Sequence, residues 1–195
     1  MTRMPVVFAA LLLSTALPTT GHSATNIPSL DEAAGRYAVT PSSDIDFAID
    51  QIGGGGIRGK FGTFSGTFDL KPGDLAHSMV NFTLKPASVS TGQGRIDAFL
   101  RSAAVFDAAD YNVISFKSDR VVQTGPETAR VSGILTAKGR SNPESFDVKL
   151  ANWNGKAIGF DVTGKILRSH YAMDVGEPIY SNVVQFNMMI EGRRA

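Results

Sequence analysis

The sequence has no cysteine, one tryptophan and three histidines among 195 residues. The lack of cysteine excludes disulfides, thiol catalysis and cysteine-ligated metals, so stability has to come from the core. His77 and His170 have no second histidine two or four residues away, so neither predicts a metal site. No Gly-x-Ser-x-Gly elbow occurs, and no pattern combines a nucleophile with a base and an orienting group. We therefore predict that the protein is not an enzyme.

An excess of charge of one sign is also missing. The chain has 19 basic and 18 acidic residues, a formal net charge of +1. Proteins that bind nucleic acid normally carry a basic stripe that neutralises phosphates, and no such stripe occurs, so no nucleic-acid partner is predicted. The hydrophobic fraction of 43% is typical of a globular chain with room for one ordinary domain.

One long, largely apolar run lies near the N-terminus. Arg3 precedes this run at residues 6–17, Pro18 ends it, and small residues follow as far as Ala24. The run is too short to cross a bilayer stably, which favours a cleaved signal peptide at residues 1–24 and a secreted protein. The next residues, 25–35, show no sustained period and are interpreted as an N-terminal lead-in.

From Tyr37 onward, apolar residues alternate with polar ones. Ile45, Phe47 and Ile49 show this pattern near the start of the domain. Alternation directs one apolar face inwards and one polar face towards water, as in half-buried strands. The predicted strands are 37–51, 57–70, 77–90, 112–123, 128–138, 144–152, 157–168 and 181–192.

Segments rich in glycine and proline separate the strands and predict turns, among them Gly53–Gly56 and Ser141-Asn142-Pro143. Gly54 and Gly59-Lys60 also have the spacing of a phosphate-binding loop. However, Phe61 replaces the Ser or Thr that would hold magnesium, and a strand pattern follows instead of a helix. A hairpin is therefore predicted here.

The segment Arg95–Ala109 breaks the alternation. Its apolar residues recur at spacings of three and four, which predicts a short helix or two helical turns. The whole pattern indicates an all-β fold, an eight-stranded antiparallel barrel with a short helical insertion. A two-sheet sandwich buries the same pattern, and the periodicity leaves both architectures open. It also leaves open whether a barrel would be hollow or filled.

Specific segments resemble the YceI-like family, and they occur in the family's order over nearly all of residues 36–193. The segments that carry the resemblance are Tyr37–Phe47, Gly59–Gly66, Ser88–Gly92, Asp97–Tyr111, Ile114–Ser118, Val131–Pro143 and Gly159–Ser169. The resemblance implies a lipocalin-like barrel, usually in the bacterial periplasm. It also implies a carrier that holds a polyisoprenoid, an isoprenoid quinone or a fatty-acid derivative in its lumen.

Two groups of residues are predicted to contact such a ligand. The first group consists of inward-parity apolar residues and apolar residues of the helical insertion: Phe47, Ile49, Phe82, Leu84, Phe99, Leu100, Phe106, Phe116, Phe160, Val162, Phe186 and Met188. The second group lies near polar positions where the chain departs from the family motifs, and is predicted to contact a head group: Gln51, Arg95, Asp97 and Arg168. The bound long-chain lipid is the only cofactor expected, with no metal.

Other interpretations remain open at this point. A homodimer is implied because several family members occur as dimers, and transient contact with a membrane or a membrane cytochrome is a further candidate interaction. One alternative function is a non-catalytic interaction module with a filled barrel. Another is an accessory protein of a quinone-linked membrane redox system, which would share the same pocket.

Overall fold

The computed structural model describes residues 29–195, so the predicted signal peptide at 1–24 lies outside the described residues. No helix within 29–195 is long and apolar enough to cross a membrane. The elements are β1 (Gly35–Val39), β2 (Asp44–Gln51), β3 (Gly56–Phe61), β4 (Phe64–Leu70), η1 (Leu75–His77), β5 (Met79–Leu84), η2 (Pro86–Ser88), β6 (Val89–Ser90), α1 (Gly94–Arg101), β7 (Ile114–Gln123), β8 (Thr128–Ala137), β9 (Arg140–Trp153), β10 (Ala157–Leu167), η3 (Arg168–Tyr171) and β11 (Tyr180–Arg194).

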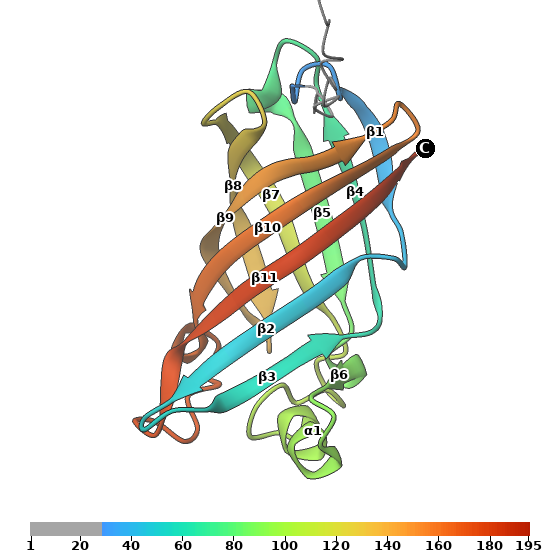
Figure 1. Cartoon of the computed structure of the whole chain (residues 1–195). Coiled ribbons are helices and arrows are strands. Elements are labelled where there is room, and N and C mark those ends of the chain that lie inside the picture. Colours follow the sequence, from blue (N-terminus) through green and yellow to red (C-terminus); the bar gives the residue numbers. More distant parts are fainter. Residues whose placement is uncertain (1–28) are drawn as a thin grey trace, which may run out of the picture.

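The strands form a closed antiparallel barrel (Figure 1). Eight strands pair in the order β1, β4, β5, β7, β8, β9, β10 and β11, and β11 pairs back with β1. Closure satisfies the backbone groups that sheet edges would leave unpaired. The predicted eight-stranded barrel with a helical insertion is confirmed, and the sandwich alternative is wrong.

Three of the predicted strands are divided in two. The run 37–51 breaks at 40–43 around Pro41, and the run 77–90 breaks at η2, which begins with Pro86. Proline has no N–H to donate to a strand ladder, which favours a break at each site. The run 57–70 breaks at Gly62-Thr63. The division lets β11 pair with β1 near one end of the barrel and with β2 near the other.

The turn predicted at Ser141-Asn142-Pro143 is wrong. These residues lie in β9, and the chain reverses earlier, at Lys138 and Gly139, which both have positive φ. Pro143 is tolerated because this part of β9 pairs with β8 while the pairing with β10 begins only at Phe146. A proline is compatible with a strand that has a free edge on one side. The hairpin predicted at Gly53–Gly56 is confirmed as the β2–β3 connection.

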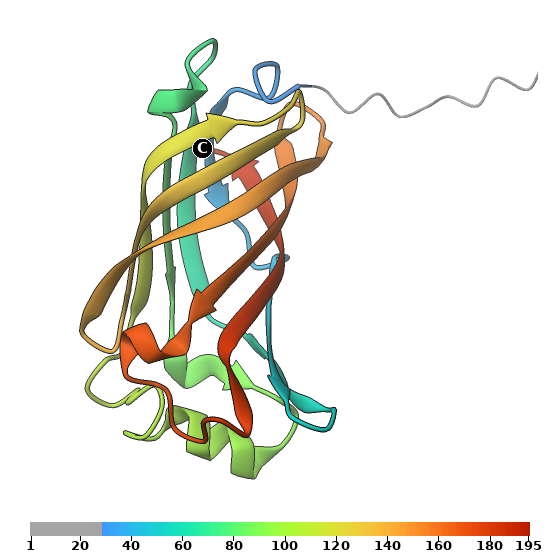
Figure 2. The ribbon, with the colours of Figure 1, turned by 90° about the vertical axis from the view of Figure 1, so that its left-hand side faces the viewer.

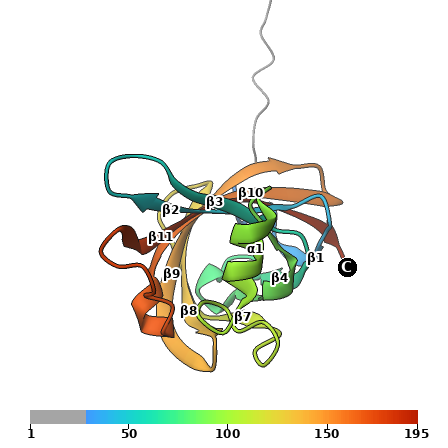
Figure 3. The same cartoon turned by 90° about the horizontal axis from the view of Figure 1, so that it is seen from below.

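Helix α1 lies across one end of the barrel (Figure 3). It is shorter than the segment 95–109 that the spacing marked, because Ser102 ends it with a hydroxyl that donates to the carbonyl of Phe99 at 2.7 Å. Asp107 then adopts a left-handed conformation with a φ of 49°. Only the first part of the predicted helical segment is therefore helical.

The opposite end of the barrel is closed by the described part of the lead-in. Leu30 and Ala33 are buried, and the amide of Leu30 donates to the carbonyl of Pro126 at 2.9 Å. The lead-in and the C-terminus lie together at this end, far from α1 (Figure 2). The N-terminal lead-in is thus part of the packed structure from Leu30 onward.

Candidate ligand-binding site

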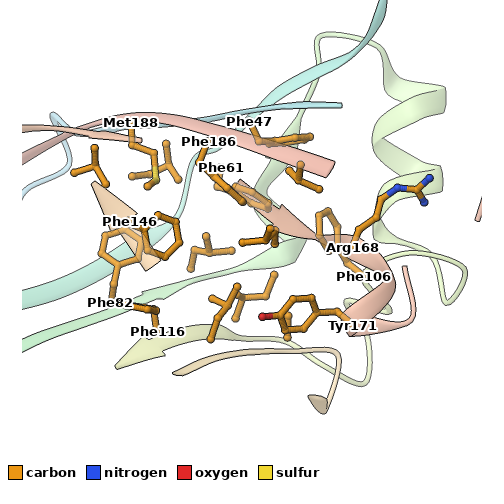
Figure 4. A pocket seen from close by; sticks show the side chains of 18 of the residues that line it. Phe47, Phe61, Phe82, Phe106, Phe116, Phe146, Arg168, Tyr171, Phe186 and Met188 are labelled. Carbon is orange, nitrogen blue, oxygen red and sulfur yellow. The ribbon is translucent and has the colours of Figure 1, made fainter. Parts of the chain in front are cut away.

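The barrel encloses an apolar cavity of about 640 Å³. Its wall is made by alternate residues of the strands, such as Val184, Phe186 and Met188 on β11, as expected for inward parity. All twelve apolar residues that were predicted to contact a ligand lie in this wall. Figure 4 shows aromatic side chains that converge on the cavity from several strands. The volume falls within the ~300–1,000 Å³ typical of small-molecule sites.

The wall also contains residues that were not predicted to contact a ligand. Phe61 and Phe146 are two of them, and both have the inward parity that could have identified them. Tyr171, Met173 and Val175 reach the wall from η3 and the loop that follows it. No alternation marks this loop, so only tertiary structure brings these residues to the cavity.

Polar side chains face the cavity mainly at the α1 end. The polar wall residues there are Arg95, Arg168, Tyr171 and Tyr180. Two further polar wall residues, Thr67 and Asn81, have exposed side chains, as their outward strand parity requires. The cavity is therefore apolar along the barrel and polar near one end.

The Arg168 side chain is only 5% exposed and is fully engaged by backbone. Its guanidinium donates to the carbonyls of Met173, Val175, Tyr180 and Ser181 at 2.5–2.9 Å. The carboxylate of Glu177 lies 3.9 Å away. The planar, multi-donor guanidinium suits this task, and it organises the loop 172–180 at the edge of the cavity. Its main observed contacts are therefore within the protein.

Arg95 differs from Arg168 because its side chain is exposed and lies in the cavity wall. Within residues 29–195, its guanidinium makes neither a hydrogen bond nor an ion pair. Among the four predicted head-group residues, Arg95 is therefore the one whose charge is available to a ligand in the described structure.

The structure places Asp97 and Gln51 outside the cavity wall. The amide and hydroxyl of Thr91 both donate to the Asp97 carboxylate at 2.7 Å and lower the pKa of that carboxyl. Asp97 thus stabilises the connection into α1. Gln51 ends β2 opposite Tyr180. Both residues lie near the α1 end, and neither side chain belongs to the cavity wall.

The hydroxyl of Tyr171 donates to the Glu144 carboxylate at 3.0 Å. Burial raises the pKa of the Tyr171 hydroxyl, and the neighbouring carboxylate raises it further. Burial also raises the pKa of Glu144, against the opposing effects of Tyr171 and His170. Tyr171 therefore stays protonated at neutral pH, and it adds a neutral polar group to the cavity wall.

The sequence matches the model of a known protein family. The model of the YceI-like domain matches residues 37–192. The chain belongs to the YceI-like family. The resemblance found in the sequence is thereby confirmed, over almost the same range of residues.

Relatives of this YceI-like protein include Protein YceI of Escherichia coli O157:H7, which is 31% identical over 153 residues, covering 76% of this chain and 80% of that protein. BcnA of Burkholderia cenocepacia has a similar crystal structure, with a TM-score of 0.72 and 25% identity over 78% of this chain and 98% of BcnA. A polyisoprenoid binding domain from Saccharophagus degradans shares the fold at 14% identity, with a TM-score of 0.68 over 83% of this chain and 99% of that domain.

The YceI-like barrel carries exposed apolar side chains around its α1 end. Ile52 is 72% exposed in the β2–β3 turn, and Ile179 is 57% exposed in the loop 172–180. The two segments are joined by a hydrogen bond from the amide of Ile52 to the carbonyl of Ile179 at 3.0 Å. Phe99 and Val175 are also exposed and belong to the cavity wall. Apolar surface thus continues from inside the cavity to the outside.

No group of three or more His, Cys, Asp and Glu side chains within residues 29–195 is arranged to hold a metal ion. The cavity lies almost entirely among aliphatic and aromatic carbons. Within residues 29–195, the polar side chains of its wall lie at the α1 end, apart from the exposed Thr67 and Asn81.

Proposed function

We propose that this protein is a non-catalytic carrier that holds one long-chain apolar ligand, a polyisoprenoid, an isoprenoid quinone or a fatty-acid derivative, in the bacterial periplasm. The observation that carries the proposal is the apolar cavity of about 640 Å³ inside a closed barrel. The name of the Saccharophagus degradans domain, a polyisoprenoid binding domain of the same fold, supports this ligand class. The apolar run at residues 6–17 supports export.

Burial of a long chain supplies the free energy of binding. Each methylene that leaves water contributes roughly 0.8 kcal/mol, so a chain of about 20 carbons gains on the order of 16 kcal/mol before costs. Ordering of the chain and association with the protein remove part of this gain. A ligand of this kind has negligible free solubility, and its passage through an aqueous compartment requires an apolar container.

The distribution of polar groups favours one orientation of the ligand. A polar end group at α1 would meet the Arg95 guanidinium and water, whereas at the opposite end it would be buried among apolar side chains without a partner. Burial of an unpaired polar group costs several kcal/mol, roughly 2–7 in apolar surroundings. The apolar chain therefore points along the barrel, with its polar end at α1.

The cavity argues against the filled-barrel alternative, since an interaction module with a packed core would have no enclosed volume of this size. A role in quinone-linked electron transfer would use the same cavity. It would differ by a requirement for a membrane partner, which co-purification with a membrane cytochrome would reveal.

Native extraction and a matched pair of variants test the carrier function. Val162 is buried in the cavity wall, and Thr163 is exposed beside it on β10. Val162→Phe should reduce the affinity for a fluorescent long-chain probe by about tenfold or more, because overpacking costs about 1–3 kcal/mol. Thr163→Phe should leave affinity unchanged.

Mass spectrometry of organic extracts should detect a long-chain lipid in the native protein.

The carrier proposal fails if native extracts never contain a lipid and no long-chain probe binds. Equal effects of Val162→Phe and Thr163→Phe would also contradict binding inside the barrel. N-terminal sequencing of the protein from a periplasmic fraction tests the export proposal separately, with cleavage near Ala24 expected.

A further inference from the structure

Three phenylalanines of the cavity wall lie against glycines on the strand with which they pair. The directly paired residues are Phe47 with Gly59, Phe82 with Gly66, and Phe146 with Gly164. A Cβ atom added to any of these glycines would lie 2.4–2.8 Å from the nearest atom of its partner's ring. Real Cβ atoms do not approach so closely, so each ring occupies the space that a side chain would need. An aromatic ring over a strand glycine is a known stabilising arrangement.

The pairing of phenylalanine with glycine affects how wide the cavity is. Phenylalanine side chains are large, and a barrel of this size fills readily with them. Here the glycines leave room at the barrel wall, and Phe47, Phe82 and Phe146 line the cavity without filling it. Because each ring occupies the space beside a glycine, the interior of the barrel stays wider than it would be with a side chain at that position.

We infer that Gly59, Gly66 and Gly164 set the width of the cavity, and thereby determine how well it accepts a methyl-branched chain relative to an unbranched one. An unbranched alkyl chain is thinner and does not need the extra space. The inference rests on the proposed carrier function and identifies residues that determine which chains fit the cavity.

Gly164 offers the sharpest test among the three glycines. All three nearest neighbours of a Cβ at Gly164 belong to the Phe146 ring, whereas Cβ atoms at Gly59 and Gly66 would also meet backbone carbonyls. The Phe146 ring is flanked by Phe116, with centroids 5.2 Å apart, and by Phe186 at 6.3 Å. An alanine at Gly164 therefore pushes the Phe146 ring into the open cavity.

Gly62→Ala supplies a matched control. A Cβ at Gly62 would have its nearest neighbour, the carbonyl oxygen of Ser88, at 3.8 Å, an ordinary contact. Phytol and hexadecanol supply matched ligands, because they have the same backbone length and differ mainly in methyl branches. Displacement of a fluorescent fatty-acid probe from the full mature chain measures the affinity of each alcohol.

Gly164→Ala should weaken phytol binding by about tenfold and hexadecanol binding by less than about threefold, because the displaced Phe146 ring narrows the cavity. Adding Phe146→Leu should restore phytol binding, because the smaller side chain no longer needs the space over residue 164. Gly62→Ala should bind both alcohols as the wild type does. Equal loss for both alcohols, or no restoration by Phe146→Leu, would overturn the inference.

A second measurement needs neither ligand binding nor a folded Gly164→Ala variant. The ring current of Phe146 should displace the NMR chemical shift of one Gly164 Hα proton in the wild type, and Phe146→Leu should abolish the displacement. An undisplaced shift overturns the inference even if the carrier function holds. Conversely, a wild type that shows the displaced shift but binds neither alcohol would contradict the carrier function while supporting the packing.

Discussion

The two ends of the barrel hold irregular backbone in a similar way but in different surroundings. At the closed end, the buried hydroxyl of Tyr37 donates to the carbonyl of Ala33 at 2.8 Å and accepts from Trp153 at 3.0 Å and Arg194 at 3.1 Å. At the α1 end, the guanidinium of Arg168 donates to carbonyls of the neighbouring loop. Each end thus depends on one polar side chain that satisfies several partners.

The surroundings of the two polar centres differ. Tyr37 is enclosed by buried residues such as Leu30 and Ala33, and its ring stacks on Phe68 at 5.3 Å. Arg168 holds a loop that exposes Val175 and Ile179 and also contributes to the cavity wall. One end is thus enclosed by buried side chains, whereas exposed apolar surface and polar wall groups coincide at the α1 end.

The largest loss of stability should come from removing the Tyr37 side chain at the closed end. Tyr37→Ala removes a fully buried ring, and the free energy of unfolding should fall by about 3–5 kcal/mol. Tyr37→Phe keeps the ring on Phe68, loses only the hydroxyl, and should cost about 1–3 kcal/mol. Urea unfolding measures both values. Tyr37→Phe should retain ligand affinity, because Tyr37 does not line the cavity; a large loss of affinity would contradict this separation of Tyr37 from the cavity.

At the α1 end, Arg168→Met should lower the free energy of unfolding by about 2–3 kcal/mol, because the backbone carbonyls bound by Arg168 lose their donor. The loss is limited because the loop 172–180 can form hydrogen bonds with water instead. Amide hydrogen exchange should accelerate in residues 173–181 and remain slow in β1 and β8. Ligand affinity should fall with it, because Met173 and Tyr180 line the cavity. Arg168→Lys should restore little, since lysine lacks the planar set of donors. Unchanged exchange would refute the role of Arg168.

Transfer to membranes should depend on the exposed apolar residues at α1. Ile52→Ser with Ile179→Ser should slow ligand transfer from vesicles, because exposed apolar side chains favour contact with a membrane surface. Affinity should not change, because neither residue lines the cavity. Ile134→Ser with Met189→Ser, which changes exposed apolar residues on β8 and β11, is the control. Equal transfer rates for the two double variants would contradict contact through α1.

The smallest effect concerns Glu144. Burial raises the pKa of its carboxyl above the ordinary value of 4.5, so ionisation removes stability as the pH rises through the folded-state pKa. Glu144→Gln keeps an acceptor for the Tyr171 hydroxyl and carries no charge. Its Tm should be slightly above that of the wild type at pH 7–8, and the difference should disappear well below the ordinary pKa. Thermal unfolding across this pH range checks the sign.

Much of the barrel could be predicted because alternation of apolar and polar residues reports directly which face of a strand is buried. This is why residues such as Phe47, Val162 and Phe186 were selected and all lie in the cavity wall. The head-group residues were harder to select, because polar side chains have no comparable periodicity. Asp97 accepts hydrogen bonds from Thr91, and Arg168 donates hydrogen bonds to backbone carbonyls. The fold sets these partners.

The sequence by itself determined the strands, their inward faces, the hairpin at Gly53–Gly56 and the family, because these depend on local pattern and motif. Only the tertiary structure decided that the sheet closes and that its interior stays open. Closure requires β11 to reach β1, and openness requires Gly164 to stand opposite Phe146. Both depend on how separate strands are aligned with one another, which the alternation within a single strand does not report.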